Sequence, residues 1–157
     1  MFCGLSFLSV PLIINLPSKL IWNVSNSVPR GLYWVTDETP FHGDIAVVRL
    51  PFHVRKQASE LKILPMNVLL LKPVAALQDD EICRLGDVVL INKEAVSVAL
   101  KHDQQGQKLP QWQGCFTLKR DEFFLLSDHQ NSFDGRYFGT IKHQNIEGMA
   151  KPLWIWK

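Results

Sequence analysis

Apolar residues alternate with polar ones, or gather in short runs, along most of this chain, which is the pattern of β-strands rather than of long helices. Segments containing Pro, Gly, Asn and Asp separate the runs. The expected strands are residues 32–35, 44–50, 67–77, 88–91, 95–100, 115–118, 123–126 and 149–156. Short strands joined by turns predict a mainly β domain.

Short polar connections join some of these strands into expected hairpins. Residues 92–94 are the loop of the first hairpin, and residues 119–122 are the loop of the second. Residues 84–87 have a glycine among charged residues and predict a turn. Residues 127–139 are also polar and predict a turn-rich loop.

One segment, residues 52–63, predicts a helix. Its apolar positions Phe52, Ala58 and Leu61 form a thin stripe, and prolines at positions 51 and 65 bound it. We expect a short helical excursion on the surface of the β body.

The N-terminus has a different composition, because residues 1–18 contain no charged side chain. A membrane-spanning helix needs roughly 20 apolar residues, so this run is short unless it extends to Trp22, which could lie at the membrane interface. We predict an apolar membrane anchor or uncleaved signal segment at residues 1–22, followed by one domain at residues 23–157. A buried N-terminal strand or helix is the alternative.

The side of the membrane on which the body lies is open from these residues alone. Lys19 and Arg30 follow the apolar segment and no basic residue precedes it, which by the positive-inside rule would put the body in the cytoplasm. Cys83 and Cys115 could form a disulfide if the body faces an oxidising compartment.

Composition and charge narrow the function. The chain has 157 residues, 46% of them apolar, which suits one packed domain. Lys and Arg number 17 against 15 Asp and Glu, which is too balanced for a protein that grips nucleic-acid phosphates, so no nucleic-acid partner is expected. The five histidines are scattered, and no Cys or His pair has the close spacing of a zinc site. We expect no metal and no cofactor.

Lys72 interrupts the apolar run at residues 69–77. Its side chain either snorkels out of a half-buried strand or is truly buried. Burial disfavours the ammonium form and would lower the pKa of the amine from ~10.4 toward neutrality. A neutral amine at physiological pH is a general base.

Ser27 lies in a turn in which Pro29 and Gly31 would fix the backbone and expose the hydroxyl. A serine hydroxyl needs an adjacent base to act as a nucleophile, and Lys72 could supply it in a serine–lysine dyad. Ser25 could offer its hydroxyl to a developing oxyanion beside the Ser27 backbone N–H. Taken alone, the segment is also an ordinary turn.

Together, three segments resemble the S26 family of serine proteases, the type I signal peptidases, and most of all its conjugative-transfer (TraF) branch. Residues 23–33 match the nucleophile box and residues 70–74 match the lysine box. Residues 132–139 match the box Ser-x-Asp-x-Arg-Tyr-x-Gly, which is the most specific of the three. The resemblance extends over about residues 20–156 and implies a signal-peptidase-like β-barrel or sheet body.

The resemblance also implies roles for individual residues. Ser27 is the expected nucleophile and Lys72 the expected general base. Ser25 is expected to help form the oxyanion hole. The hydroxyl of Ser132 is expected to bind the Lys72 amine and orient it.

The same resemblance implies how the third segment is supported. Asp134 and Arg136 are expected to hold it in place as an ion pair. The chain departs from the family directly after the lysine, where Pro73 replaces the usual arginine. That arginine commonly pairs with the acidic residue at the position of Asp128, so this support of the site is in doubt.

By resemblance, the protein is a membrane-anchored serine endopeptidase that removes a leader or tail from exported proteins. Its substrate would be a propilin or another exported preprotein, and the conjugative branch implies maturation, in some systems cyclisation, of a pilin subunit. The catalytic domain would lie on the periplasmic side of the bacterial inner membrane. A general type I signal peptidase and a non-catalytic β-barrel component of a secretion or transfer apparatus are the alternatives.

Overall fold

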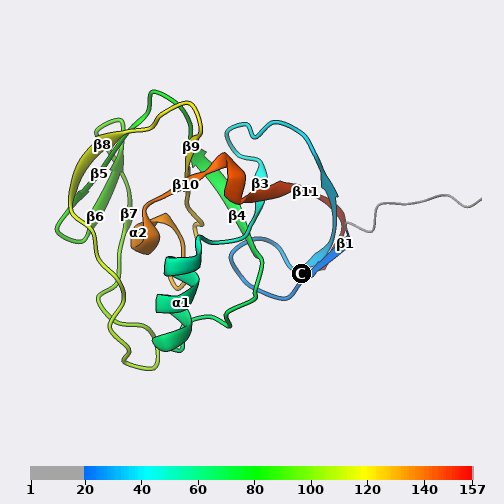
Figure 1. Ribbon diagram of the computed structural model, residues 1–157, viewed down its shortest axis with the longest axis horizontal. Helices are drawn as coiled ribbons and strands as arrows, with labels where there is room; N and C mark the ends of the chain where they lie inside the picture. The colour runs from blue at the N-terminus through cyan, green and yellow to red at the C-terminus, as the bar shows by residue number, and fades with distance from the viewer. Residues whose placement is uncertain (1–19, 157) are drawn as a thin grey trace, which may run out of the picture.

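The computed structural model describes residues 20–156, and Figure 1 shows two sheets, the smaller at the left of the view. Strands make up 42% and helices 12% of these residues, so the prediction of a mainly β domain is confirmed. In the larger sheet of the described residues, the order is β1 (Leu20–Asn23), β2 (Gly31–Thr36), β11 (Ile146–Ile155), β3 (Ile45–Val48), β4 (Leu70–Ala76), β9 (Glu122–Leu125) and β10 (Thr140–Lys142). In the smaller sheet, the order is β7 (Glu94–Val98), β6 (Val88–Ile91), β5 (Glu81–Leu85) and β8 (Gly114–Thr117).

Strand β4 is an interior strand of the larger sheet, because β3 and β9 pair with its two edges. Leu70, Leu71, Val74 and Ala76 in this strand are all buried. Burial on both faces explains why the sequence here is nearly continuous in apolar residues. The predicted strand is confirmed, and it carries Lys72 into the core.

Helix α1 (Phe52–Glu60) follows Pro51 and confirms the predicted helix. Its buried side chains, Val54 and Ala58, are about one turn apart and pack against the core of the larger sheet. The remaining positions are exposed or half-buried, as expected for a short surface helix.

Residues 127–139 are largely buried from residue 132 onward and include helix α2 (Gly135–Phe138), so they are more than the polar loop that the sequence predicted. Gly135 packs directly on β9, because a Cβ atom there would lie 2.6 Å from the Phe124 ring and 2.7 Å from the Leu125 carbonyl oxygen. A short 3-10 helix, η1 (His143–Asn145), separates β10 from β11.

The first predicted hairpin is confirmed, since β6 pairs with β7, but the second is wrong. Strand β8 pairs with β5, whereas β9 pairs with β4 and β10 in the other sheet. The chain between them crosses from one sheet to the other at Leu118, which exchanges backbone hydrogen bonds with Asp79 and Asp80. A short polar connection is therefore not enough to predict that two strands pair with each other.

The turn predicted at residues 84–87 is wrong in its first half, because β5 continues through Leu85. Arg84 is fully buried in this strand rather than exposed in a turn. Its guanidinium donates to the main-chain carbonyls of Gly86 and Arg136. A charged residue was misread as a turn residue because its acceptors are main-chain atoms, which the sequence does not reveal.

Cys83 and Cys115, whose pairing the sequence left open, form a disulfide. They lie directly opposite each other in the β5–β8 pair, with their Cα atoms 4.1 Å apart. The bond therefore ties the edge strand β8 to its neighbour in the smaller sheet.

The predicted anchor at residues 1–22 lies mostly outside the described residues. Leu20, Ile21 and Trp22 belong to β1, which pairs with β2 along the whole of its length. The folded body therefore begins before the predicted boundary at residue 23. Among residues 20–156, no helix combines the length and apolarity needed to cross a membrane.

Candidate active site

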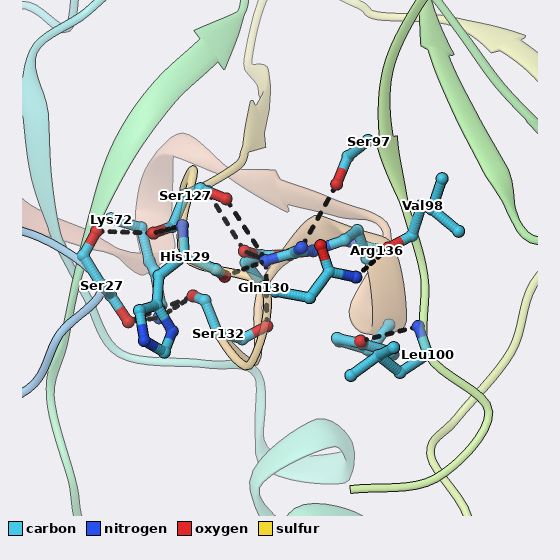
Figure 2. A network of polar contacts seen from close by, with 12 residues as sticks. Ser27, Lys72, Ser97, Val98, Leu100, Ser127, His129, Gln130, Ser132 and Arg136 are labelled. Carbon is cyan, nitrogen blue, oxygen red and sulfur yellow. Dashed lines mark hydrogen bonds and ion pairs between the residues drawn. The ribbon is translucent and has the colours of Figure 1, made fainter.

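Polar side chains from three distant parts of the chain meet beside strand β4 (Figure 2). Lys72 Nζ lies 2.5 Å from Ser27 Oγ and 2.6 Å from Ser132 Oγ, and the two hydroxyl oxygens are 3.1 Å apart. Lys72 is 4% exposed, so its side chain is buried and does not snorkel into solvent. The structure thus brings together the lysine and two of the serines that the sequence indicates.

Asn23, at the end of β1, holds the turn that presents Ser27. Its Nδ2 group donates to the carbonyls of Ser25, Val28 and Pro29 at 3.1, 3.2 and 3.1 Å. One side chain therefore binds three main-chain acceptors of the turn, and the Pro29 carbonyl also accepts from the Tyr33 hydroxyl at 2.6 Å. The turn is fixed from inside, which keeps the Ser27 hydroxyl directed at the β4 lysine.

Burial lowers the pKa of Lys72 from 10.5 to about 8. The Asp134 carboxylate opposes this shift in part, and the Arg136 guanidinium adds to it. Near pH 8, about half of the amines are therefore neutral and able to accept a proton. An amine this close to a serine hydroxyl can serve it as a general base.

Asp134 and Arg136 form a buried ion pair behind Ser132. Arg136 Nη2 lies 2.7 Å from Asp134 Oδ2, and the two side chains are 1% and 0% exposed. Arg136 also donates to the carbonyls of Ser127, His129 and Ser132. Asp134 in turn accepts from the backbone N–H of Ser127. The pair thus ties together the two ends of the loop that carries Ser132.

Ser25 lines the cavity in front of Ser27, but its hydroxyl has another partner. It donates to Asn23 Oδ1 at 2.8 Å, and the same oxygen accepts from the Ser25 backbone N–H at 3.1 Å. The hydroxyl would have to rotate before it could donate to an oxyanion beside the Ser27 N–H. Its predicted role therefore stays a prediction.

Two cavities meet at Ser27. The first has a volume of about 440 Å³, opens onto Lys72 and Ser132, and has a largely aliphatic wall. The aliphatic residues in that wall are Ile21, Val24, Ile63, Leu64, Val68, Leu69, Leu70, Leu71, Leu100 and Leu109. The second, of about 500 Å³, is lined in part by Arg30 and Asp128. An extended peptide could therefore pass Ser27 with one cavity on each side of the hydroxyl.

Pro73 and Asp128 both line the second cavity, and Asp128 is exposed. Pro73 accepts a backbone hydrogen bond from Leu126 at 3.1 Å, which keeps β4 beside β9 at this point. Support of the loop around Asp128 comes from the buried pair of Asp134 and Arg136, which needs no arginine at position 73.

Sequence reasoning missed three residues that shape this site. Asn23 holds the Ser27 turn, and Ser127 Oγ donates to the Ser27 carbonyl at 2.6 Å. His129, one of the five scattered histidines, lines both cavities. Asn23 belongs to the nucleophile box, which gave it no role, and the main-chain partner of Ser127 is 100 residues away in sequence, so no local pattern could mark that contact. Within residues 20–156, no group of three or more His, Cys, Asp or Glu side chains is arranged to hold a metal ion.

The chain is similar in sequence to proteins of a known family. The sequence profile of the family described as "Signal peptidase, peptidase S26" matches residues 1–156. Two proteins of Escherichia coli, each named plasmid transfer protein TraF, are 33% and 30% identical to this chain, and each match covers 85% of this chain and 82% of the relative. A signal peptidase I from Enterococcus faecalis of known structure is 19% identical, with a TM-score of 0.41 over 73% of this chain and 98% of the other.

Proposed function

Because the chain belongs to the signal peptidase family S26, we propose that it is a serine endopeptidase in which Ser27 is the nucleophile and Lys72 the general base. The observation that carries this proposal is the position of the buried Lys72 amine, 2.5 Å from Ser27 Oγ. A desolvated amine beside a serine hydroxyl is the arrangement that a serine–lysine dyad requires.

In the proposed reaction, Ser27 Oγ attacks the carbonyl carbon of the scissile bond while the neutral Lys72 amine takes the hydroxyl proton. The Ser27 backbone N–H and, after rotation, the Ser25 hydroxyl stabilise the oxyanion. Lys72 then gives the proton to the leaving amine, the C–N bond breaks and the acyl group remains on Ser27. Water or an incoming amine next attacks the acyl carbon and gives a proton to Lys72. The bond to Ser27 Oγ then breaks, and Lys72 returns that proton to Ser27 Oγ. The Ser132 hydroxyl keeps the Lys72 amine aligned throughout.

The substrates we propose are exported proteins with an apolar leader or tail that is removed after a small residue. The aliphatic wall of the first cavity suits the apolar part of such a segment, and the second cavity leaves room for the residues on the other side of the scissile bond. The matched relatives are named plasmid transfer proteins, which supports a role in conjugation. A propilin is therefore the substrate we expect, with hydrolysis or cyclisation as the two fates of the acyl-enzyme.

We further propose that the site works at the periplasmic surface of the inner membrane. Exposed apolar side chains gather near the Ser27 turn, at β1 and the end of β11: Leu20, Trp22, Val24, Leu153, Trp154 and Ile155. The Trp22 and Trp156 rings lie 4.6 Å apart and extend this group as an aromatic surface. Tryptophan is favoured at the membrane–water interface, so this surface suits contact with a bilayer.

The proposal is tested with the full chain and a preprotein that carries an apolar leader ending in alanine. We expect cleavage at the end of the leader and an acyl adduct on Ser27 that mass spectrometry detects in a rapidly quenched reaction. Ser27→Ala should abolish both, whereas Ser59→Ala, a serine of α1, should change neither. Cleavage that persists in Ser27→Ala would show that Ser27 is not the nucleophile, whereas an unaltered chain that cleaves nothing would leave a non-catalytic β component as the better description.

The pH dependence follows from the Lys72 pKa of about 8. Because only the neutral amine can take the Ser27 proton, kcat/KM should rise about tenfold per unit at low pH and level off above about pH 8. A lysine with an ordinary pKa would extend the rise beyond about pH 10. Initial rates between pH 6 and 10, with the fold monitored by circular dichroism, distinguish the two, and a rise that continues to pH 10 would contradict the proposed base.

A further inference from the structure

Arg84 is a buried cation outside the residues that the proposed reaction uses. It lies in β5 of the smaller sheet and is 0% exposed. Its Nη1 group donates to the Arg136 carbonyl at 2.6 Å, and its Nε group donates to the Gly86 carbonyl at 3.2 Å. Its Nη2 group has no hydrogen-bond partner among the described residues. Its acceptors are main-chain carbonyls.

This arrangement is costly for the fold. Burial lowers the pKa of Arg84. The Nη2 group gives up its hydrogen bonds to water on folding and gains no hydrogen bond to the protein in exchange. A methionine could fill much of the same space without burying a charge, and buried charges are often replaced by apolar residues with no loss of stability. Stability alone therefore does not account for an arginine here, and its contact with Arg136 becomes the feature to explain.

The Arg84 bond is one of several hydrogen bonds that attach the smaller sheet and nearby residues to the loop at residues 127–139. Figure 2 shows the part of this attachment at Ser97, Val98 and Leu100. From the smaller sheet and nearby residues, Arg84 donates to the Arg136 carbonyl, the Leu100 N–H to the Tyr137 hydroxyl, and Trp112 Nε1 to the Gly135 carbonyl. From the loop, Arg136 Nη1 donates to Ser97 Oγ and Gln130 Nε2 to the Val98 carbonyl. The Arg84 bond is the shortest of them and is buried. The Cys83–Cys115 disulfide joins β5 to β8 at the residue before Arg84.

We propose that Arg84 is a positioning residue for the Ser27–Lys72 pair. It holds the main chain at Arg136, and Arg136 holds Asp134 and the carbonyl of Ser132. The inference rests on the proposed function, to which it adds a role for the smaller sheet as the support that keeps the Ser132 hydroxyl against the amine.

The groups around the Lys72 amine predict how replacing Arg84 would change the pKa of Lys72. Asp134 and Arg136 lie behind the amine, and His129 and Asp103 line the cavity in front of it. If the Arg136 main chain shifts, the loop loosens, water reaches the amine and the contact with Ser132 weakens. Because desolvation is the largest cause of the lowered Lys72 pKa, that pKa should then move back toward its ordinary value.

The test compares Arg84→Met and Arg84→Lys with the unaltered full chain. In Arg84→Met, we expect kcat/KM near pH 7 to fall about tenfold and the rising limb of the pH profile to move up by about one unit, with KM little changed. Arg84→Lys keeps the charge but cannot reach both carbonyls, so it should give a smaller shift in the same direction. Arg49→Met is the matched control, because Arg49 is an exposed arginine paired with Glu147 away from the site.

A second measurement does not depend on activity. The Lys72 amine is titrated by NMR of ¹³C-labelled lysine ε-carbons, with the signal assigned from Lys72→Met. The inference is supported if the Lys72 titration and the pH profile shift together in the Arg84 variants. In Arg49→Met, neither the titration nor the pH profile should shift. An unmoved Lys72 titration in folded Arg84→Met, or in Arg84→Lys if the first variant does not fold, would overturn it. Failure of the proposed function would give a different result, because cleavage by the chain would then not require Ser27.

Discussion

Replacing Lys72 by methionine is expected to lower kcat/KM by about 10⁴-fold or more, while the protein stays folded. The Ser27 hydroxyl loses the only group that lies within hydrogen-bond distance of it and can accept its proton among the described residues. The fold should tolerate the change, because Lys72 is buried and methionine has a similar length and no charge to desolvate. The two hydroxyl groups left behind, on Ser27 and Ser132, are 3.1 Å apart and can bond to each other.

The measurement pairs cleavage rates near pH 8 with denaturant unfolding of the same variants. Lys72→Arg should be as inactive as Lys72→Met, since a guanidinium stays protonated and cannot act as a base. Lys56→Met, at an exposed position on α1, serves as the control for loss of a lysine and should keep full activity. If folded Lys72→Met retained a tenth or more of the activity, another group would have to be the base.

Lys72 also illustrates how far the sequence alone can lead. The apolar run around it predicted strand β4, and local composition was enough for that. Whether its amine is buried depends on β3 and β9, which cover the edges of β4, and on the loop that contains Ser132. Those neighbours come from other parts of the chain, so the residues next to Lys72 could not decide between snorkelling and burial.

The same limit explains the errors in the fold. Strands β8 and β9 are close in sequence and joined by a polar connection, yet each finds its partners in a different sheet. Pairing is decided by which face each strand can bury, and Phe124 in β9 is buried against Ile82 and Val89 of the smaller sheet. Such long-range contacts have no local signature.

For the site, a sequence motif identified Ser27, Lys72 and Ser132, and the structure brings these three together. The motif begins at Asn23 but gave it no role, and it does not include Arg84; the contacts of both residues with main-chain carbonyls appear only in the structure. Motifs record the residue types that chemistry needs. The hydrogen bonds that hold those residues in place can be made to any backbone, and they become visible only in the fold.

Loss of the buried ion pair of Asp134 and Arg136 is expected to have a large effect on stability. Arg136→Met should destabilise the protein by about 3–5 kcal/mol, because it leaves the Asp134 carboxylate buried without its cation. The carbonyls of Ser127, His129 and Ser132 lose a donor at the same time. Chemical denaturation followed by tryptophan fluorescence measures the change in the free energy of unfolding.

A surface pair of the same length provides the comparison. Arg49 and Glu147 are also 2.7 Å apart, but their side chains are 44% and 45% exposed, so Arg49→Met should cost about 1 kcal/mol or less. The double variant Asp134→Asn with Arg136→Met should recover part of the lost stability, because no uncompensated charge remains buried. A cost for Arg136→Met as small as that for Arg49→Met would mean that water reaches the carboxylate. The loop would then be too open to keep Lys72 desolvated, and the pH profile of cleavage should move to higher pH in the same variant.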